Sequence, residues 1–234
     1  MAQAVAQRFV RRGDQLFCLA RNSEKMARVA EGLKEGLRGS YCFDFNDNAQ
    51  AEAAVGRAVQ CLGGIDIAFL AHGDLSDQLA SEEDFAVARA TIETNMLSKI
   101  ALLIPLCRQL KTQGRGKIGV ITSVAGERGR PRNFTYGAAK GGMTLYLQGL
   151  RSSLWQSGVE IYTFIMGPVD TPMTVDHPKN FSFATVDQVA DKMVRAFGRR
   201  RYQIYVPGYW AWVMGFVRNV PESLFQKLKF LSER

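Results

Sequence analysis

The sequence has few residues that bind metals or form disulfides. It contains four cysteines and two histidines in 234 residues, and no two cysteines stand two or three residues apart. Structural zinc sites take closely spaced pairs of such ligands, so no metal site is predicted. Cys18, Cys42, Cys61 and Cys107 are interpreted as buried free thiols of an intracellular protein.

Long apolar runs and clustered basic residues are also lacking. No stretch approaches the roughly 20 apolar residues that span a bilayer, and residues 1–8 have no apolar core of a signal peptide. The net charge is +8, but residues 199–201 form the only run of three basic residues. Nucleic-acid binding is therefore not expected. The protein is expected to be cytoplasmic.

Strand-like and helix-like segments alternate along residues 1–206, which predicts an α/β fold with a doubly wound parallel sheet. The predicted strands are 15–20, 39–44, 65–71, 117–122, 160–165 and 202–206. The predicted helices are 2–10, 23–37, 48–61, 82–110, 135–157 and 185–198, of which 82–110 is one long helix or two that meet around Asn95. Ser23 is expected to cap the second helix, because a serine hydroxyl can bond the free amides there.

One element of a nucleotide-binding fold is lacking. Such folds open with a strand, a Gly-rich turn and a helix, whereas the first element predicted here is the helix. The prediction is therefore a Rossmann-like sheet without its first strand, with about 10–20 residues of strand and turn absent. Either the gene begins further upstream, or the protein is an inactive remnant that serves as a binding or scaffold protein.

A tyrosine, a lysine and a serine point to catalysis. Tyr136 and Lys140 are four residues apart in a predicted helix, so they share one face. A nearby ammonium favours the phenolate and is expected to lower the tyrosine pKa from about 10. Ser123 follows strand 117–122, where its hydroxyl would hold the same substrate oxygen. The three predict hydride transfer at a carbon bearing oxygen, although the spacing alone also suits a half-buried ring beside a solvated lysine.

With these residues the chain resembles the classical short-chain dehydrogenase/reductase family over residues 2–206. The segments that carry the resemblance are Ala2–Phe9, Leu19–Asn22, Asp44–Asp47, Leu70–Gly73 and Met166–Thr171, in the family's order. The chain departs from the family at His72, where asparagine is usual, and at Gly167-Pro168, which reverses the usual order. His72 is expected to stabilise the strand by a hydrogen bond rather than to act in catalysis.

The resemblance implies a catalytic tetrad of Asn95, Ser123, Tyr136 and Lys140. Tyr136 would be the general acid, and Lys140 would lower its pKa and hold the nicotinamide ribose. Ser123 would polarise the carbonyl. Asn95 would anchor a water that relays protons to Lys140, the other interpretation being a polar helix residue that faces solvent.

The resemblance also implies a nicotinamide cofactor. Arg21 stands where an acidic residue would hold the ribose of NAD, and an arginine there favours the 2′-phosphate of NADP. NADP(H) is therefore expected rather than NAD, unless Arg21 is an ordinary solvated arginine. Asp44 and Phe45 would contact adenine, although Asp44 also suits a turn at a strand end. The residues expected to contact the cofactor are Arg21, Asp44, Phe45, Ala71, His72, Gly73, Tyr136, Lys140, Val169 and Thr171.

Softer features suggest a branch of the family. The segment 121–130, the Ala-His-Gly variant and an aromatic tail are similar to the branch that includes decaprenylphosphoryl-2-keto-erythro-pentose reductases. This resemblance implies that NADPH reduces a keto sugar linked to a polyprenyl lipid. The family also implies a homo-oligomer formed through the long helices.

The tail, residues 207–234, follows the domain of residues 1–206. It combines Trp210 and Trp212 with Lys227 and Arg234, which suits a helix lying on a membrane surface. It equally suits a helix that covers the core or a subunit interface. In the first case the protein would be peripheral to the inner face of the membrane.

Overall fold

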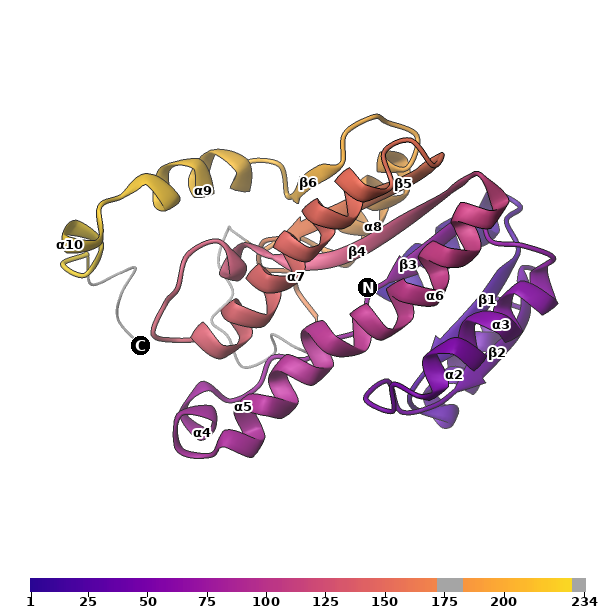
Figure 1. Cartoon of the computed structure of the whole chain (residues 1–234), viewed down its shortest axis with the longest axis horizontal. Coiled ribbons are helices and arrows are strands. Elements are labelled where there is room, and N and C mark those ends of the chain that lie inside the picture. The colour runs from indigo at the N-terminus through magenta and orange to yellow at the C-terminus, as the bar shows by residue number, and fades with distance from the viewer. Residues whose placement is uncertain (172–182, 229–234) are drawn as a thin grey trace.

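The computed structural model describes residues 1–171 and 183–228 and confirms the α/β fold. All strand pairs are parallel, and they form two sheets (Figure 1). One sheet pairs β1 (Leu16–Ala20) with β2 (Leu37–Cys42), and the other has the order β3 (Ile67–Leu70), β4 (Gly116–Ser123), β5 (Val159–Met166), β6 (Gln203–Val206). In the described ranges no ladder joins β1 to β3, which agrees with a doubly wound sheet that lacks its first strand.

Helices cover both faces of the larger sheet. The helices up to residue 196 are α1 (Ala2–Arg11), α2 (Ser23–Glu31), α3 (Gln50–Leu62), α4 (Gln78–Glu83), α5 (Phe85–Ile92), α6 (Ser98–Gln113), α7 (Phe134–Ser153) and α8 (Val186–Ala196). Residues of α3, α6 and α7 form the core on one face, and those of α1 and α8 form it on the other. Asn22, not Ser23, caps α2, because its side chain accepts a hydrogen bond from the Lys25 amide at 2.7 Å.

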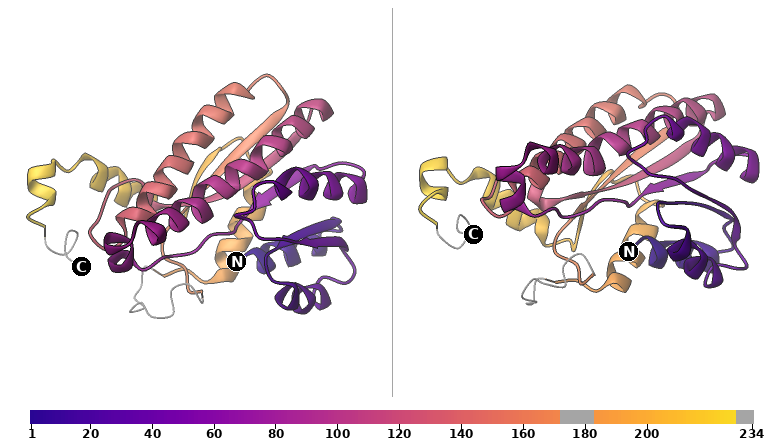
Figure 2. Two further views of the ribbon diagram at one scale, coloured as in Figure 1. Left: turned by 60° about the horizontal axis from the view of Figure 1, so that its bottom comes forward. Right: turned by 90° about the horizontal axis from the view of Figure 1, so that it is seen from below.

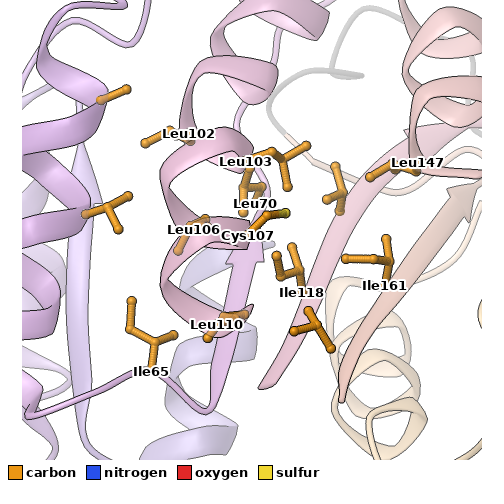
Figure 3. Close-up of a cluster of buried hydrophobic side chains, with 14 of the residues drawn as sticks. Ile65, Leu70, Leu102, Leu103, Leu106, Cys107, Leu110, Ile118, Leu147 and Ile161 are labelled. Atoms are coloured by element: carbon orange, nitrogen blue, oxygen red, sulfur yellow. The ribbon is translucent and has the colours of Figure 1, made fainter. Parts of the chain in front are cut away.

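The long apolar helix corrects the prediction about hydrophobic runs. Residues 85–113 are continuously helical and contain an 18-residue window of mean hydropathy 1.2, enough to span a membrane by length and composition. However, 56% of that window is buried inside the protein. Leu103 and Leu110 of α6 pack with Ile118 of β4 in the core (Figure 3). The segment is therefore placed as a core helix.

The C-terminal helices α9 (Trp210–Asn219) and α10 (Glu222–Phe225) lie at the opposite end of the molecule from β1 and β2 (Figures 1 and 2). Their buried side chains, including Met214 and Phe225, pack against Val124 and Ile165. Arg128 also joins the loop after β4 to Glu222 by a 2.6 Å ion pair. One face of the tail thus packs on the domain.

Cysteine burial matches the prediction fully at Cys107 alone. The four cysteines are free thiols, and Cys107 is buried. Cys18 and Cys42 are partly buried, whereas Cys61 is exposed on α3. The expectation of four buried thiols is therefore wrong at Cys61, because it lies on the outward face of an amphipathic helix.

Candidate active site

Most of the predicted site residues follow the carboxyl ends of parallel strands. Ala71, His72 and Gly73 follow β3, Ser123 ends β4, and Val169 lies just beyond β5. Ser123 is in register with Met166, so the ends of β4 and β5 lie side by side. Ligands of open α/β sheets bind at this edge, which makes it the candidate site.

Two glycines of helix α7 bring it against the turn that follows Ser123. A Cβ at Gly141 would lie 2.6 Å from the carbonyl oxygen of Gly126, and one at Gly137 would lie 2.7 Å from that of Ala125. Real side chains do not approach backbone so closely, so only glycine permits this packing. The contact places Tyr136 and Lys140 of α7 beside Ser123. The sequence interpretation had not identified these glycines as positioning residues.

Tyr136 and Ser123 form the polar centre of the site. Ser123 lies close enough to Tyr136 to act on its phenol. Burial raises the pKa of Tyr136 to about 12, the interaction with Ser123 lowers it in part, and the charge of Asp74 raises it. The predicted lowering of this pKa is therefore wrong. Lys140 Nζ lies 5.3 Å from the centroid of the Tyr136 ring.

Asn95 is fully buried, which excludes the interpretation that it faces solvent. It lies in a π-helical turn, Glu93–Leu97, between α5 and α6, and such turns are frequent at functional sites. Its amide nitrogen donates to the carbonyl of Thr91 at 3.0 Å and to the carboxylate of Asp74 at 2.9 Å. Its amide oxygen has no hydrogen-bond partner in the described structure.

Gly73 lies in close contact with two of the predicted catalytic residues. It has a φ of 152°, and a Cβ there would lie 2.7 Å from Asn95 Oδ1 and 3.2 Å from Lys140 Nζ. Only glycine therefore fits against these two side chains. An unpaired amide oxygen and an amine are groups that bond hydroxyls, so the residues present fit a nicotinamide ribose, and Lys140 is the one that would hold it.

A second group of predicted residues surrounds His72. Its ring lies against Phe45, with centroids 4.5 Å apart, and its Nε2 lies 2.9 Å from Ser98 Oγ. Burial and then the charges of Lys99, Lys140 and Arg21 hold the His72 pKa well below 6.5, so the imidazole is neutral at pH 7. The predicted hydrogen bond is confirmed, with its partner on α6.

The remaining predicted residues lie around these two groups. Asp44 is exposed, and its carboxylate accepts a 3.0 Å bond from the Asn46 amide, as expected of a turn residue. Val169 is buried and forms a parallel bridge with Ala184, so its side chain belongs to the core. Thr171 is partly buried, and the segment 172–182 after it, expected to shape the substrate pocket, lies outside the described residues.

Lys99 is a residue at the site that the sequence interpretation did not name. It is fully buried on α6, and its Nζ donates to the carbonyl oxygen of Asn95 at 3.2 Å. A Cβ placed on Gly73 would lie 3.7 Å from its Nζ and 3.2 Å from that of Lys140. Burial and the neighbouring charge of Lys140 hold the Lys99 pKa well below 10.5. The available signal was a lysine four residues after Asn95 within an otherwise apolar segment.

Comparison with known proteins decides the family. The sequence profile of the short chain dehydrogenases matches residues 1–181. The chain belongs to the short-chain dehydrogenase family. It is 32% identical to an uncharacterized oxidoreductase of Mycobacterium tuberculosis (strain ATCC 25618 / H37Rv), over 92% of this chain and 88% of the relative. It is 28% identical to the ketoacyl reductase HetN of Nostoc (strain PCC 7120 / SAG 25.82 / UTEX 2576), over 81% of this chain and 68% of the relative.

A solved structure supports the same architecture. A single-residue variant of the actinorhodin polyketide ketoreductase, crystallised with NADPH, superposes with a TM-score of 0.78. The superposition covers 88% of this chain and 91% of the ketoreductase, at 19% sequence identity. At that identity the likeness concerns the fold alone. It confirms that this short-chain dehydrogenase has the fold of a Rossmann-type ketoreductase.

Proposed function

We propose that this short-chain dehydrogenase reduces a ketone to an alcohol with NADPH. The observation that carries the proposal is the placement of Ser123 close to Tyr136 and beside the buried Lys140. A nicotinamide cofactor, when bound, supplies the hydride. The protein supplies the proton and the hydrogen bonds that hold the reacting oxygen.

Each residue has a defined role in that chemistry. Ser123 donates a hydrogen bond to the carbonyl oxygen and favours the negative charge that develops there. Tyr136, with its pKa near 12, is protonated at neutral pH and gives its proton to the same oxygen. Lys140, with its pKa lowered to about 8 chiefly by burial, carries an exchangeable proton close to the ring of Tyr136.

The preference for NADPH rests on Arg21. Arg21 is exposed directly after β1, and its charge acts on His72, so it lies close to the second group of predicted residues. A guanidinium in that place would pair with the 2′-phosphate of NADPH, and NADH has no such phosphate to pair with it.

Fluorescence titration of the purified chain with NADPH and with NADH tests this preference. We expect saturable NADPH binding that is weakened by Arg21→Asp. Arg38→Asp is the control, because it makes the same charge change at an exposed position near the start of β2. Binding of neither nucleotide would contradict the proposal and favour the alternative of an inactive binding or scaffold protein.

The substrate proposed is a keto sugar linked to a lipid, and the tail supports it. Trp212 and Phe216 are 85% and 69% exposed on one face of α9, one helical turn apart. Aromatic side chains beside cations suit the interface of an anionic membrane. The protein would then be cytoplasmic and peripheral to the inner face of the membrane.

Sedimentation with phosphatidylglycerol vesicles tests the membrane contact. We expect the wild-type chain to sediment with the vesicles and a Trp212→Ser/Phe216→Ser variant to remain in the supernatant. Leu79→Ser, at an exposed position of helix α4, is the control for loss of an apolar side chain. Equal behaviour of all three proteins would exclude the membrane role of α9.

A homo-oligomer is proposed to form through the long helices. Ile104 of α6 and Leu145 of α7 are 54% and 70% exposed, although both are aliphatic. Covering them with a second copy would remove this apolar surface from water. Light scattering should give a dimer or tetramer that Leu145→Glu dissociates, and a monomeric wild-type chain would contradict the proposal.

A further inference from the structure

Two lysines are buried side by side at the site. The exposed fractions of Lys99 and Lys140 are 0% and 3%, and a Cβ placed on Gly73 would lie 3.7 Å from Lys99 Nζ and 3.2 Å from Lys140 Nζ. The two amines therefore border the same buried point. Two ammonium groups cannot share a buried site without strong repulsion, and an ammonium cannot accept a hydrogen bond. A neutral amine on one of the two lysines removes that repulsion and supplies an acceptor.

We propose that Lys99 and Lys140 hold one proton between them and that Lys99 is a positioning residue for Lys140. The neutral amine of Lys99 accepts a hydrogen bond from the ammonium of Lys140 and donates one to the carbonyl oxygen of Asn95, 3.2 Å away. This inference rests on the proposed reductase function. The family resemblance implies a water that is bound by Asn95 and linked to Lys140. In this proposal the Lys99 side chain makes that link.

The surrounding charges agree with a single shared proton. Asp74 is the acidic group whose charge acts on both lysines, and it favours one positive charge at the pair. His72 is kept neutral by burial and by its cationic neighbours, Arg21 included. Tyr136 is protonated and neutral. Among the described residues the pair thus faces one carboxylate, from the loop after β3, and a second proton on the pair would have no further countercharge from them.

The protons balance over one reduction in this arrangement. Tyr136 gives its proton to the oxygen of the carbonyl that is being reduced, and becomes a phenolate. Lys140 returns a proton to the phenolate, which leaves both lysines neutral. The pair then takes one proton from solvent, so that one proton enters for each carbonyl reduced.

The experiment is a ¹³C NMR titration of the whole chain labelled at lysine Cε, which needs no cofactor or substrate. Lys99→Met removes the amine but keeps a chain of similar length, and Lys117→Met on β4 is the control for loss of a lysine elsewhere. We expect Lys140 to titrate near pH 8 in the wild type. Loss of the Lys99 acceptor should lower that value by about one unit, and Lys117→Met should leave it unchanged.

Either of two results would overturn the proposal: Lys99 and Lys140 both titrating at ordinary lysine values, or Lys140 titrating at the same or a higher pH in Lys99→Met. Circular dichroism and thermal melting identify a variant that has not folded. In that case Lys99→Gln replaces it, with the same expected fall. The titration separates this inference from the proposed function, because it reads the pair even where no turnover is found.

Turnover gives a second readout. The rate of ketone reduction in Lys99→Met should be close to wild type at pH 6 and about fivefold lower at pH 8. At pH 8 about one in two Lys140 side chains is protonated in the wild type, and about one in eleven in Lys99→Met. An equal loss at both pH values would indicate a merely structural role for Lys99 and would contradict the proposal.

Discussion

The close packing of α7 on the turn after β4 can be tested with one substitution made at two places. Gly141→Ala introduces a Cβ 2.6 Å from the backbone oxygen of Gly126, whereas Gly149→Ala, two turns further along α7, meets no atom within 4 Å. Both changes gain helix propensity, worth about 1 kcal/mol in a helix interior. Because that gain is common to both variants, the difference between them measures the contact.

Overpacking against atoms that cannot rotate away costs about 1–3 kcal/mol. We therefore expect Gly149→Ala to be more stable than Gly141→Ala by that amount, which is about 2–4 °C in melting temperature per kcal/mol for a chain of this size. Urea unfolding at equal m-values is the assay. Gly141→Ala should also separate Ser123 from Tyr136 and slow ketone reduction. Equal stability of the two variants would refute the reasoning.

Two further predictions concern stability. The pKa of His72 in the folded protein is well below its unfolded value of 6.5, so the unfolded chain binds the proton first, and stability should fall by about 1.4 kcal/mol per pH unit below 6.5. His72→Phe should reduce that loss in urea unfolding at pH 7 and pH 5, and an unchanged slope would contradict the assignment. Met214→Ala should lower the free energy of unfolding by about 2–5 kcal/mol, because this side chain of α9 is fully buried. Trp212→Ala, at an 85% exposed position of the same helix, should change stability little, and equal losses would show that α9 packs differently.

The sequence predicted the fold because strand and helix periodicities alternate clearly along the chain. It also predicted Ser123, Tyr136 and Lys140, since a helical spacing and a strand end bring them together. It could not predict the raised pKa of Tyr136, which depends on burial and on where Lys140 directs its amine. Lys99 was missed for a similar reason: a lysine in an apolar helix is expected to extend to water, and only the packing shows that it does not.

The sheet and the long helix differ in how far the sequence predicted them. The order of elements predicted a sheet without its first strand, and β1 and β3 are not paired in the described structure. The sequence allowed one long helix or two around Asn95, and the structure has one continuous helix over residues 85–113 with a π-helical turn at Asn95. That turn was not predicted, because it depends on the buried bonds that Asn95 makes to Thr91 and Asp74. Local sequence patterns do not contain that information.

The most direct test of the central claim is the ketone-dependent oxidation of NADPH by the wild-type chain and by Tyr136→Phe, over a panel from simple cyclic ketones to keto sugars. The account predicts turnover that falls by about 10²- to 10⁴-fold in Tyr136→Phe, because the proton donor is lost, with NADPH binding retained. Tyr146→Phe, on the same helix, should remain as active as wild type. Equal activity of Tyr136→Phe and the wild type, or no turnover of any ketone by a wild-type chain that binds NADPH, would contradict the account.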